Sequence, residues 1–337
     1  MQIQKKQPPK QVTLTKANTL NCNFSKISMK VSAIIPNYNH GGFLKQRIDS
    51  VLGQTYADVE VIILDDLSTD NSREIIEQYR GNPKVTAIVY NETNSGSPFK
   101  QWQKGMALAK GEIIWMAESD DWCEPNFLEV LVEGLTKTPG CVLAYAQTCC
   151  IDANNRIRYI TKATNLEEVV NGNNFINWHL TKGTIIVNAS MAIFKKEVFE
   201  KMPHDFTQLK FSGDWLFWIE AARLGNVFIS GRVLNFFRKH DKDVSGKAYA
   251  SGYNFIENLT ILQYLKKYGL ITEGFFRQLV FIKYAKFRQQ VKKYRPEAVQ
   301  QIKNRFWGMF PSKLEARKYF FLMQVKSSLK VSTGKKN

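Results

Sequence analysis

Two kinds of apolar pattern alternate over the first 120 residues of the chain. Four short, mostly apolar runs have the length of buried parallel strands, and they cover 31–35, 59–64, 85–90 and 113–117. Between these runs, apolar residues recur at three- and four-residue spacing, which predicts helices over about 44–52, 72–80 and 99–110. Because strands and helices alternate in this order, the sequence predicts an α/β fold with a mostly parallel sheet and helices on both faces.

Two local signals predict where helices in this region begin. Asn71 can cap the helix that follows it, with Glu74 three residues later as its partner in a capping box. Pro125 stands where a first-turn proline would open the next helix. Both signals place a helix shortly after the polar segment that follows a predicted strand.

The rest of the chain is less regular. Strands are expected near 141–147, 189–194 and 226–237, and helices near 172–180, 195–201 and 213–224. From about residue 250 the pattern is helical and rich in Lys, Phe and Tyr. We therefore expect a mobile basic N-terminal arm over 1–29, an α/β domain over 30–245, and a basic, aromatic-rich helical region over 246–337.

Charge is unevenly distributed among these parts. The 337 residues carry a net charge of +17. Residues 1–30 hold six lysines and no acidic residue, residues 283–337 hold fifteen Lys and Arg against two Glu, and the middle of the chain is close to neutral. The two basic ends are therefore expected to contact something anionic, while the middle is the expected chemical unit.

Composition excludes several classes of protein. With 44% hydrophobic and 23% charged residues, the chain has the composition of a globular protein rather than a disordered or collagen-like one. No run approaches about 18 uninterrupted apolar residues, and the lysine-rich N-terminus lacks the apolar stretch of a secretory signal. Five cysteines, an odd number without metal-ligand or redox spacing, favour a reduced, cytoplasmic protein.

Polar clusters directly follow three of the predicted strands. They are Asn37-Tyr38-Asn39, Asp65-Asp66 and Asp120-Asp121. In parallel α/β sheets, ligands bind beyond the carboxyl ends of the strands. The coincidence of three polar clusters with three such ends therefore predicts one binding site there.

Each cluster has a chemical interpretation and a plain structural one. Asp120 and Asp121, with Glu118 nearby, are suited to hold Mg²⁺ or Mn²⁺ against a substrate diphosphate, because these cations prefer oxygen ligands. The alternative is a solvated acidic turn. Asp66 could accept a hydrogen bond from a base N–H or a ribose hydroxyl, or belong to a helix entrance made of capping residues. Tyr38 could stack on a flat base, or pack in an ordinary turn.

Two further candidates lie outside these clusters. Asp214 is flanked by Trp215 and Trp218, which would exclude water from the carboxylate and raise its pKa, as suits a general base. The alternative is an N-cap aspartate. His240 follows an apolar strand, and it could ligate the metal or contact phosphate, as could Arg238, or belong to a surface basic cluster.

The order and spacing of these clusters resemble the family 2 glycosyltransferases with the GT-A fold. The resemblance covers about residues 30–245. It is carried by VSAIIPNYN at 31–39, IDSVLGQTY at 48–56, VEVIILDDLSTDNS at 59–72, NSG at 94–96, AKGEII at 109–114, ESDD at 118–121, GDW at 213–215 and FRKH at 237–240. Each segment alone is a weak signal, but the ordered set is specific.

The resemblance implies a reaction and a donor site. The enzyme would move a sugar from a nucleotide-diphosphate sugar, with a UDP-sugar expected, to an acceptor hydroxyl, and would invert the anomeric configuration. Tyr38 and Asp66 would hold the nucleotide base, with Pro36 shaping the pocket. Asp120 would contact the ribose or the diphosphate.

The resemblance also implies a metal, a base and an acceptor. Asp121 would bind a divalent cation, Mn²⁺ or Mg²⁺, and His240 would lie near the metal or the diphosphate. Asp214 would deprotonate the acceptor hydroxyl. The acceptor would be a saccharide or a lipid-linked molecule, in bacterial polysaccharide or glycolipid assembly.

Three positions depart from the family pattern. Leu67 stands where a glycine usually follows the paired aspartates, so this turn is expected to differ in shape. Glu118 stands where aspartate is usual. Gly213 replaces the usual glutamate before the base, so a supporting carboxylate is expected to be missing.

The basic C-terminal end predicts a contact with a membrane. Leu314, Phe321, Val325 and Leu329 share one helical face, with basic residues on its flanks. We expect residues 283–337 to rest on an anionic membrane surface, which would make the protein peripheral on the inner face of the cell membrane. The alternative is a helical bundle packed on the α/β domain with a solvated basic rim.

Other functions have weaker support in the sequence. Nucleic-acid binding through the interleaved basic and aromatic residues of 283–321 is possible in principle, but no recognised nucleic-acid motif is present. A dinucleotide-dependent oxidoreductase is disfavoured, because the first strand is followed by Pro36 to Asn39 rather than a glycine-rich turn. A non-catalytic relative of the glycosyltransferases is a further alternative.

Overall fold

The computed structural model describes residues 29–240 and 251–333, with side chains up to residue 323. The predicted N-terminal arm, apart from Met29, falls outside the described residues. The side chains of Val325 and Leu329 also fall outside them. The four cysteines in the described ranges are buried and form no disulfide with one another.

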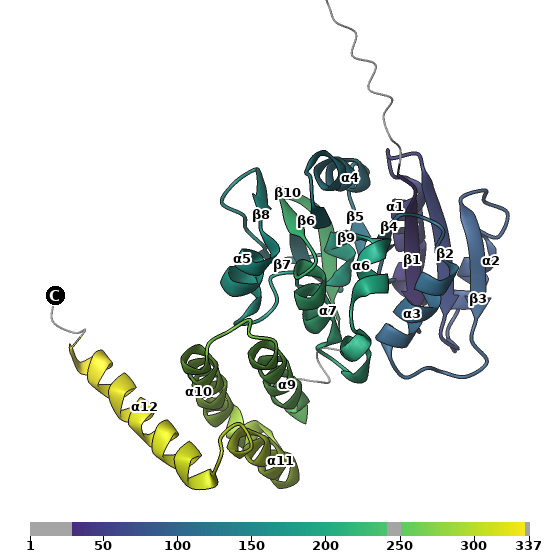
Figure 1. Cartoon of the computed structure of the whole chain (residues 1–337). Helices are drawn as coiled ribbons and strands as arrows, with labels where there is room; N and C mark the ends of the chain where they lie inside the picture. The colour runs from purple at the N-terminus through teal and green to yellow at the C-terminus, as the bar shows by residue number, and fades with distance from the viewer. Residues whose placement is uncertain (1–28, 241–250, 334–337) are drawn as a thin grey trace, which may run out of the picture.

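A ten-stranded mixed sheet forms the centre of the fold (Figure 1). Its first half is parallel, in the order β3-β2-β1-β4, and consists of β1 (Val31–Asn37), β2 (Val59–Asp65), β3 (Val85–Tyr90) and β4 (Ile113–Met116). Every residue of β1 and β2 is buried, because helices cover both faces of a sheet of this kind. These four strands and the predicted α/β class are confirmed.

The second half of the sheet contains a reversed strand. It continues the order with β9 (Ala192–Lys195), β6 (Cys141–Asp152), β10 (Asn226–Lys239) and β5 (Trp122–Cys123). Strand β9 is antiparallel to both β4 and β6, whereas β6 and β10 are parallel. Two short strands, β7 (Ile157–Ile160) and β8 (Glu167–Val170), pair with β6 and β10. The sequence did not predict β5, β7 or β8, which lack a long apolar run.

Helices cover the two faces of the sheet and divide the core into two layers. One layer packs beneath α1 (Gly41–Leu52), α2 (Ser72–Glu77) and α4 (Phe127–Lys137). The other packs beneath α3 (Pro98–Leu108) and α7 (Gly213–Ala222). Shorter elements on the chain between β8 and α7 are α5 (Gly172–Phe175), a π-helical turn over Ile176–Leu180 and α6 (Lys196–Lys201).

The helical region predicted after residue 250 is present. It consists of α9 (Tyr253–Lys267), α10 (Glu273–Gln290), α11 (Pro296–Trp307) and α12 (Lys313–Thr333). Buried residues of these helices, among them Phe255, Leu262 and Phe287, belong to the same hydrophobic core as the α3 and α7 layer. The helical region is therefore packed onto one face of the α/β unit rather than separated from it.

The predicted start of α2 is confirmed in position but not in its capping bond, and the predicted start of α4 needs correction. Asn71 is the N-cap residue of α2, but its side chain makes no capping hydrogen bond. A carboxylate oxygen of Asp70 accepts the hydrogen bond from the backbone N–H of Ser72 instead, at 3.0 Å. Helix α4 begins at Phe127, two residues after Pro125. The carbonyl of Pro125 accepts a hydrogen bond from the backbone N–H of Thr55, which ties this proline to the neighbouring loop before the helix begins.

Candidate active site

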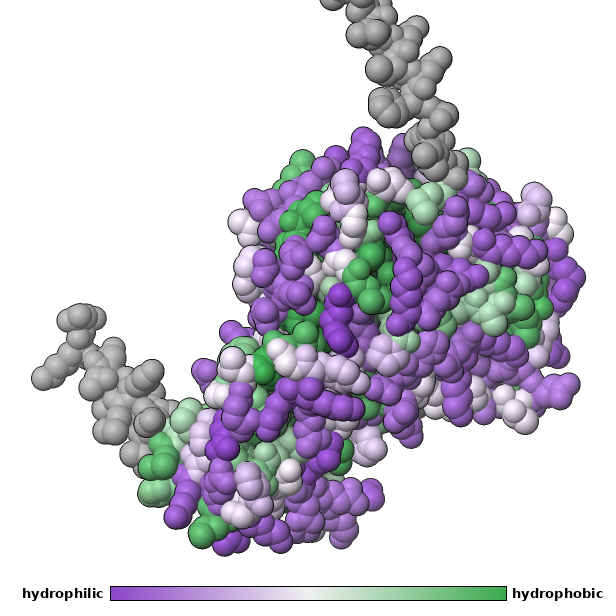
Figure 2. Space-filling view, viewed as in Figure 1, coloured by the Kyte–Doolittle hydropathy of each residue, from purple (hydrophilic) through white to green (hydrophobic). Residues whose placement is uncertain are grey.

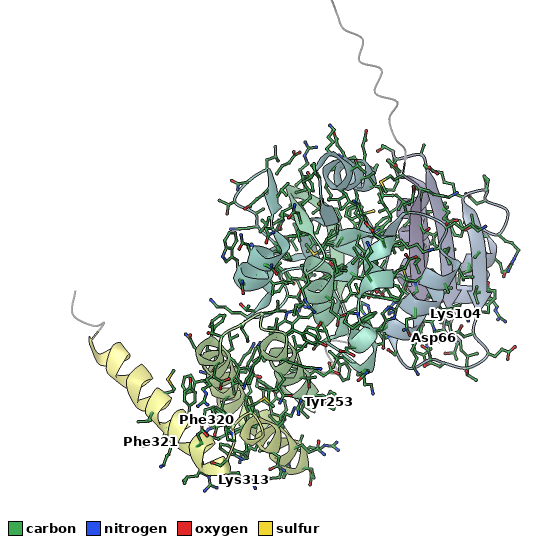
Figure 3. The ribbon with its side chains drawn as sticks, in the orientation of Figure 1. Asp66, Lys104, Tyr253, Lys313, Phe320 and Phe321 are labelled. Atoms are coloured by element: carbon green, nitrogen blue, oxygen red, sulfur yellow. The ribbon has the colours of Figure 1, made fainter. Side chains whose placement is uncertain are left out.

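A cavity of about 1090 Å³ lies at the carboxyl ends of β1, β2 and β4. Its lining includes Pro36, Tyr38 and Asp66, all of which the sequence placed in the nucleotide site. Lys210 to Phe211, just before α7, and Tyr253, at the start of α9, also line it. Figure 3 labels Asp66 below the strand ends and Tyr253 on α9. The cavity is therefore bounded by both the sheet and the helical region.

Tyr38 is a solvent-exposed aromatic side chain in the lining of the cavity. It is 48% exposed, whereas Pro36 beside it is buried at the end of β1. The loop is fixed behind the ring, because the side-chain oxygen of Asn39 accepts a hydrogen bond from the backbone N–H of Thr69 at 2.7 Å. Tyr38 can therefore present a flat face to a base without rearrangement of the loop.

Asp66 is buried and its carboxylate is already well supplied with donors. One oxygen accepts hydrogen bonds from the Asn91 amide, the Ser95 backbone N–H and the Gln101 amide at 2.6, 2.8 and 3.0 Å. The other accepts one from the Ser95 hydroxyl at 2.7 Å. A carboxylate has about four acceptor positions, so in this structure Asp66 anchors the loop around Ser95, which belongs to the cavity wall.

Leu67 adopts a left-handed backbone conformation. Its φ is +63°, in the left-handed region that costs a non-glycine residue about 1 kcal/mol. The turn after β2 thus has a left-handed geometry that glycine would accept at little cost, and Leu67 bears the strain.

Three side chains from distant segments form a group that could hold a metal ion. They are His40, Asp120 and His240, whose ligand atoms all lie within 4.8 Å of one another. The Nε2 atom of His240 is 3.0 Å from a carboxylate oxygen of Asp120, and the two imidazole rings meet edge to face with centroids 5.3 Å apart. The carboxylate suits Mn²⁺ or Mg²⁺, and the two imidazole nitrogens are ligands of divalent transition metals.

Electrostatics favour an ionised Asp120. Its burial alone would raise its pKa, but the hydrogen bond with His240 and the charge of His40 outweigh burial and lower the pKa below its ordinary value. A carboxylate must be deprotonated to bind a metal. Asp120 is therefore in the ionised form that metal binding requires, and the imidazoles of His40 and His240 lie beside it.

Asp121, the metal ligand expected from the sequence, is turned into the protein. It is 2% exposed. One oxygen accepts a hydrogen bond from the Asn188 amide at 2.6 Å, and the other accepts one from the backbone N–H of Arg238 at 3.0 Å. The buried guanidinium of Arg47 lies 3.8 Å away. These contacts tie the segment between β4 and β5 to the turn before β9 and to β10, and Asp121 does not line the cavity.

Glu118 is a third carboxylate of the same strand end. Its oxygen accepts a hydrogen bond from the indole N–H of Trp102 at 3.0 Å, and the residue lines the cavity. Burial, together with the negative charge of Asp120, raises the pKa of Glu118 to about 8. Glu118 is therefore mostly protonated at neutral pH and can donate as well as accept a hydrogen bond.

Asp214 lies in the first turn of α7. The N-cap residue of this helix is Ser212, so the alternative of an N-cap aspartate is not supported. Burial, and after it the charge of Glu257, raises the pKa of Asp214 to about 6. Its neighbours Trp215 and Trp218 are buried. Asp214 itself is not among the residues that line the cavity, but it lies three positions after Phe211, which is.

Sequence reasoning missed several residues that meet at this site. His40 is the N-cap residue of α1, and one of its ring nitrogens is 2.8 Å from the Ser119 hydroxyl. Extending the polar cluster that follows β1 by one residue would have included it. Phe211 and Tyr253, whose rings meet edge to face at 5.7 Å, carry no local signal, because they are brought together only by packing of α9 against the loop before α7.

Comparison with known proteins identifies the family. The profile described as Glycosyl transferase family 2 matches residues 32–202, which is half of the chain. The chain belongs to glycosyltransferase family 2. An uncharacterized glycosyltransferase of the cyanobacterium Nostoc is 40% identical over 107 residues, a segment that covers 31% of this chain and 32% of that protein.

Solved structures agree with the GT-A fold. One of them is Staphylococcus aureus TarS, a poly(ribitol-phosphate) β-N-acetylglucosaminyltransferase, which is 35% identical over 105 residues covering 30% of this chain and 18% of that protein. A crystal structure of its residues 1–349 with UDP-GlcNAc superposes with a TM-score of 0.63 at 22% identity, over 82% of this chain and 79% of that one. The mannosyltransferase PcManGT of Pyrobaculum calidifontis, with GDP-Man and Mn²⁺, has a TM-score of 0.50 at 15% identity over 92% and 89% of the two chains.

The sequence matches are partial. The aligned segments span about a third of the Nostoc glycosyltransferase and less than a fifth of TarS. The family profile matches residues 32–202, so the family rests on the α/β unit. No helix within the described residues is both long enough and apolar enough to cross a bilayer.

Proposed function

We propose that this family 2 glycosyltransferase moves a sugar from a nucleotide-diphosphate sugar to an acceptor hydroxyl with inversion of configuration. The observation that carries the proposal is one cavity at the strand ends that is lined by Tyr38, Asp66 and His40. His40 also belongs to the possible metal-binding group with Asp120 and His240. TarS structures that share the fold contain UDP-GlcNAc and UDP, and the mannosyltransferase contains GDP-Man. A UDP-sugar is therefore the first donor to test.

In this proposal the nucleotide occupies the wall formed by the ends of β1 and β2. Tyr38 stacks on the base and Pro36 closes the pocket beneath it. Asp66 acts chiefly by holding the loop around Ser95 in place, since its own acceptor positions are filled. This role differs from the direct base contact expected from the sequence, and it still makes Asp66 necessary for nucleotide binding.

We place the divalent cation, Mn²⁺ or Mg²⁺, at Asp120 with His40 and His240 as partners. Asp121 is the weaker candidate, because both of its oxygens already accept hydrogen bonds from inside the protein. The cation would stabilise the negative charge that develops on the departing diphosphate. The chain itself orients the ligand side chains, since Asp120 is held by His240 and His40 by Ser119.

Asp214 is the proposed general base. A hydroxyl oxygen attacks the anomeric carbon as the bond to the diphosphate breaks, and the hydroxyl proton passes to the Asp214 carboxylate. A pKa of about 6 leaves this carboxylate ionised at neutral pH while making it a better proton acceptor than an ordinary aspartate. One carboxylate suffices because a single displacement forms no covalent intermediate.

The direct test is a donor-hydrolysis screen across nucleotide sugars, with and without Mn²⁺. Release of UDP from a UDP-sugar, lost on addition of EDTA and lost in Asp214→Asn, is the expected result. Tight UDP binding without turnover of any donor would instead indicate a non-catalytic relative. Turnover unaffected by EDTA would remove the cation from the proposal.

The acceptor is proposed to be a saccharide or a lipid-linked molecule, reached at an anionic membrane surface through residues 283–337. The outward face of α12 supports this contact. Leu314, Phe321 and Leu322 on this face are 63%, 65% and 57% exposed. Lys313, Arg317 and Lys318 beside them are also exposed.

The opposite face of α12 is already occupied. Phe320 is buried and stacks on Tyr284 of α10 with ring centroids 4.1 Å apart. Figure 3 shows Phe320 on the side of α12 that faces the other helices and Phe321 on the far side. Figure 2 shows apolar side chains over α12 among hydrophilic ones. An apolar stripe bordered by cations matches the boundary between acyl chains and anionic headgroups.

Vesicle flotation tests the membrane contact. The full chain should float with phosphatidylcholine vesicles that contain phosphatidylglycerol, and Phe321→Ser with Leu322→Ser should reduce this binding about tenfold. Ile157→Ser on β7, which removes an equally exposed apolar side chain (65%), serves as the matched control. Equal binding to neutral and anionic vesicles would refute the electrostatic part, and loss of a dimer in the double variant would assign the face to a second copy.

A further inference from the structure

A buried carboxylate from the helical region is bonded to the loop that precedes α7. Glu257, on α9, is 3% exposed. Its carboxylate accepts hydrogen bonds from the backbone N–H groups of Lys210, Phe211 and Ser212 at 2.6, 3.0 and 2.7 Å. Three hydrogen bonds to a buried charge are among the stronger ways to fix a loop.

The loop held in this way leads directly to the proposed base. Lys210 and Phe211 line the cavity, Ser212 is the N-cap residue of α7, and Asp214 lies in the first turn of that helix. A small displacement of 210–212 would therefore move both the cavity wall and the Asp214 carboxylate. Because catalytic groups must be placed to within a fraction of an ångström, the contact with Glu257 bears on activity and not only on folding.

The loop has no room for a carboxylate of its own beside the base. A Cβ atom on Gly213 would lie 2.5 Å from the carbonyl oxygen of Phe206 and 2.5 Å from the ring of Phe99. Any larger residue at this position would displace the helix start or the ring. The fold therefore leaves no room for the glutamate that usually stands before the base. Glu257 of α9 brings a carboxylate to the same loop from more than 40 residues later in the chain.

We propose that Glu257 is a positioning residue of the transfer reaction, which fixes the 210–212 loop so that Asp214 faces the acceptor hydroxyl. The inference rests on the proposed function, and it makes α9 part of the active site rather than an appendage. It also explains why α9 shares a continuous hydrophobic core with α7, since a positioning contact requires both helices to be rigidly packed.

Glu257 also acts on Asp214 through its charge. After burial, the negative charge of Glu257 is the next contribution that raises the pKa of Asp214, while the positive charge of Lys239 lowers it. Replacing Glu257 with glutamine removes the charge and keeps the size of the side chain. A glutamate that stabilises the fold far from Asp214, as Glu60 does, would leave the titration of Asp214 unchanged when it is replaced.

The experiment compares Glu257→Gln with Glu60→Gln as a matched control. Glu60 is also buried (1% exposed) and also accepts three hydrogen bonds, one of them from the backbone N–H of Lys110. It lies in the first part of β2, whereas the cavity lies at the carboxyl end of that strand. UDP release from UDP-GlcNAc with Mn²⁺, or from the best donor of the hydrolysis screen, is measured from pH 5 to 8, together with UDP affinity and thermal stability.

In Glu257→Gln we expect kcat to fall about tenfold, with a smaller change in UDP affinity, and the acid limb of the pH profile to move to lower pH. Glu60→Gln should lose stability with kcat and the pH profile unchanged. Glu257→Asp, which keeps the charge, should keep the wild-type pH profile even where its kcat falls, and it serves if the glutamine variant does not fold. Wild-type kcat and profile in Glu257→Gln, or equal losses in Glu60→Gln, would overturn the inference. No turnover by the wild-type protein would overturn the proposed function itself, and this inference with it.

Discussion

The carboxylate of Asp214 affects stability and activity in opposite directions, and both effects follow from its pKa. Burial, assisted by the charge of Glu257, raises this pKa from 3.8 to about 6, while the Trp215 backbone N–H and the charge of Lys239 oppose the increase. In the folded protein the ionised form is therefore disfavoured relative to the unfolded chain. At neutral pH the protein carries this cost because the proposed base must be ionised.

The sign of the stability effect follows from proton linkage. The folded state binds the proton more tightly than the unfolded state, so Asp214 contributes stability at low pH that is lost as the pH rises through about 6. For pKa values of about 6 and 3.8, the loss between pH 5 and pH 8 is about 1.4 kcal/mol. Asp214→Asn has no such titration, so its stability relative to the wild-type protein should increase by roughly this amount over the same range.

Chemical denaturation of both proteins at pH 5, 6, 7 and 8 measures the difference. The wild-type turnover should fall about tenfold per pH unit below pH 6, since only the ionised fraction of the base is active, and Asp214→Asn should show almost no turnover at any pH. Asp152→Asn is the control for loss of a carboxylate. Hydrogen bonds from the backbone N–H groups of Arg156 and Asn154 lower the pKa of Asp152, so that variant should show no gain in stability with rising pH.

Two results would refute this reasoning. If the stability difference between Asp214→Asn and the wild-type protein stays constant from pH 5 to 8, the pKa of Asp214 is not raised. If the difference grows as expected but wild-type turnover is flat between pH 5 and 7, Asp214 is buried as described and another group accepts the proton.

Three further predictions test other parts of the site and the fold. Asp66→Asn should weaken UDP binding about tenfold by calorimetry, because an amide group would turn donors toward Ser95 and loosen the cavity wall; unchanged affinity would mean that the loop does not depend on this carboxylate. Asp120→Asn should reduce Mn²⁺ affinity at least tenfold and Asp121→Asn much less, and the reverse order in a titration would return the metal to Asp121. Gly172→Ala should destabilise the protein by roughly 1–3 kcal/mol. A Cβ atom at this position would collide with the backbone carbonyl oxygens of Ala222, at the end of α7, and Gly225, before β10. An unchanged melting temperature would show that this contact can relax.

The sequence determined the local elements and the family. Mostly apolar runs identified β1 to β4, because strands covered by helices on both faces bury most of their side chains. The polar residues that end these strands identified the binding edge, because parallel strands bring their carboxyl ends to one side of a sheet. Tyr38, Asp66 and Asp120 could be assigned to that edge for this reason alone.

Tertiary structure decided what depends on contacts between distant segments. Neighbours in sequence take opposite roles, since Asp120 faces two histidines while Asp121 is turned inward to Asn188 and Arg238. The reversed strand β9, which separates the halves of the sheet, has no distinctive pattern of its own. The packing of whole elements sets the direction of a side chain at a strand end. It also pairs Glu257 with a loop that lies 45 or more residues earlier in the chain. Short-range patterns of apolar and polar residues do not encode these long-range contacts.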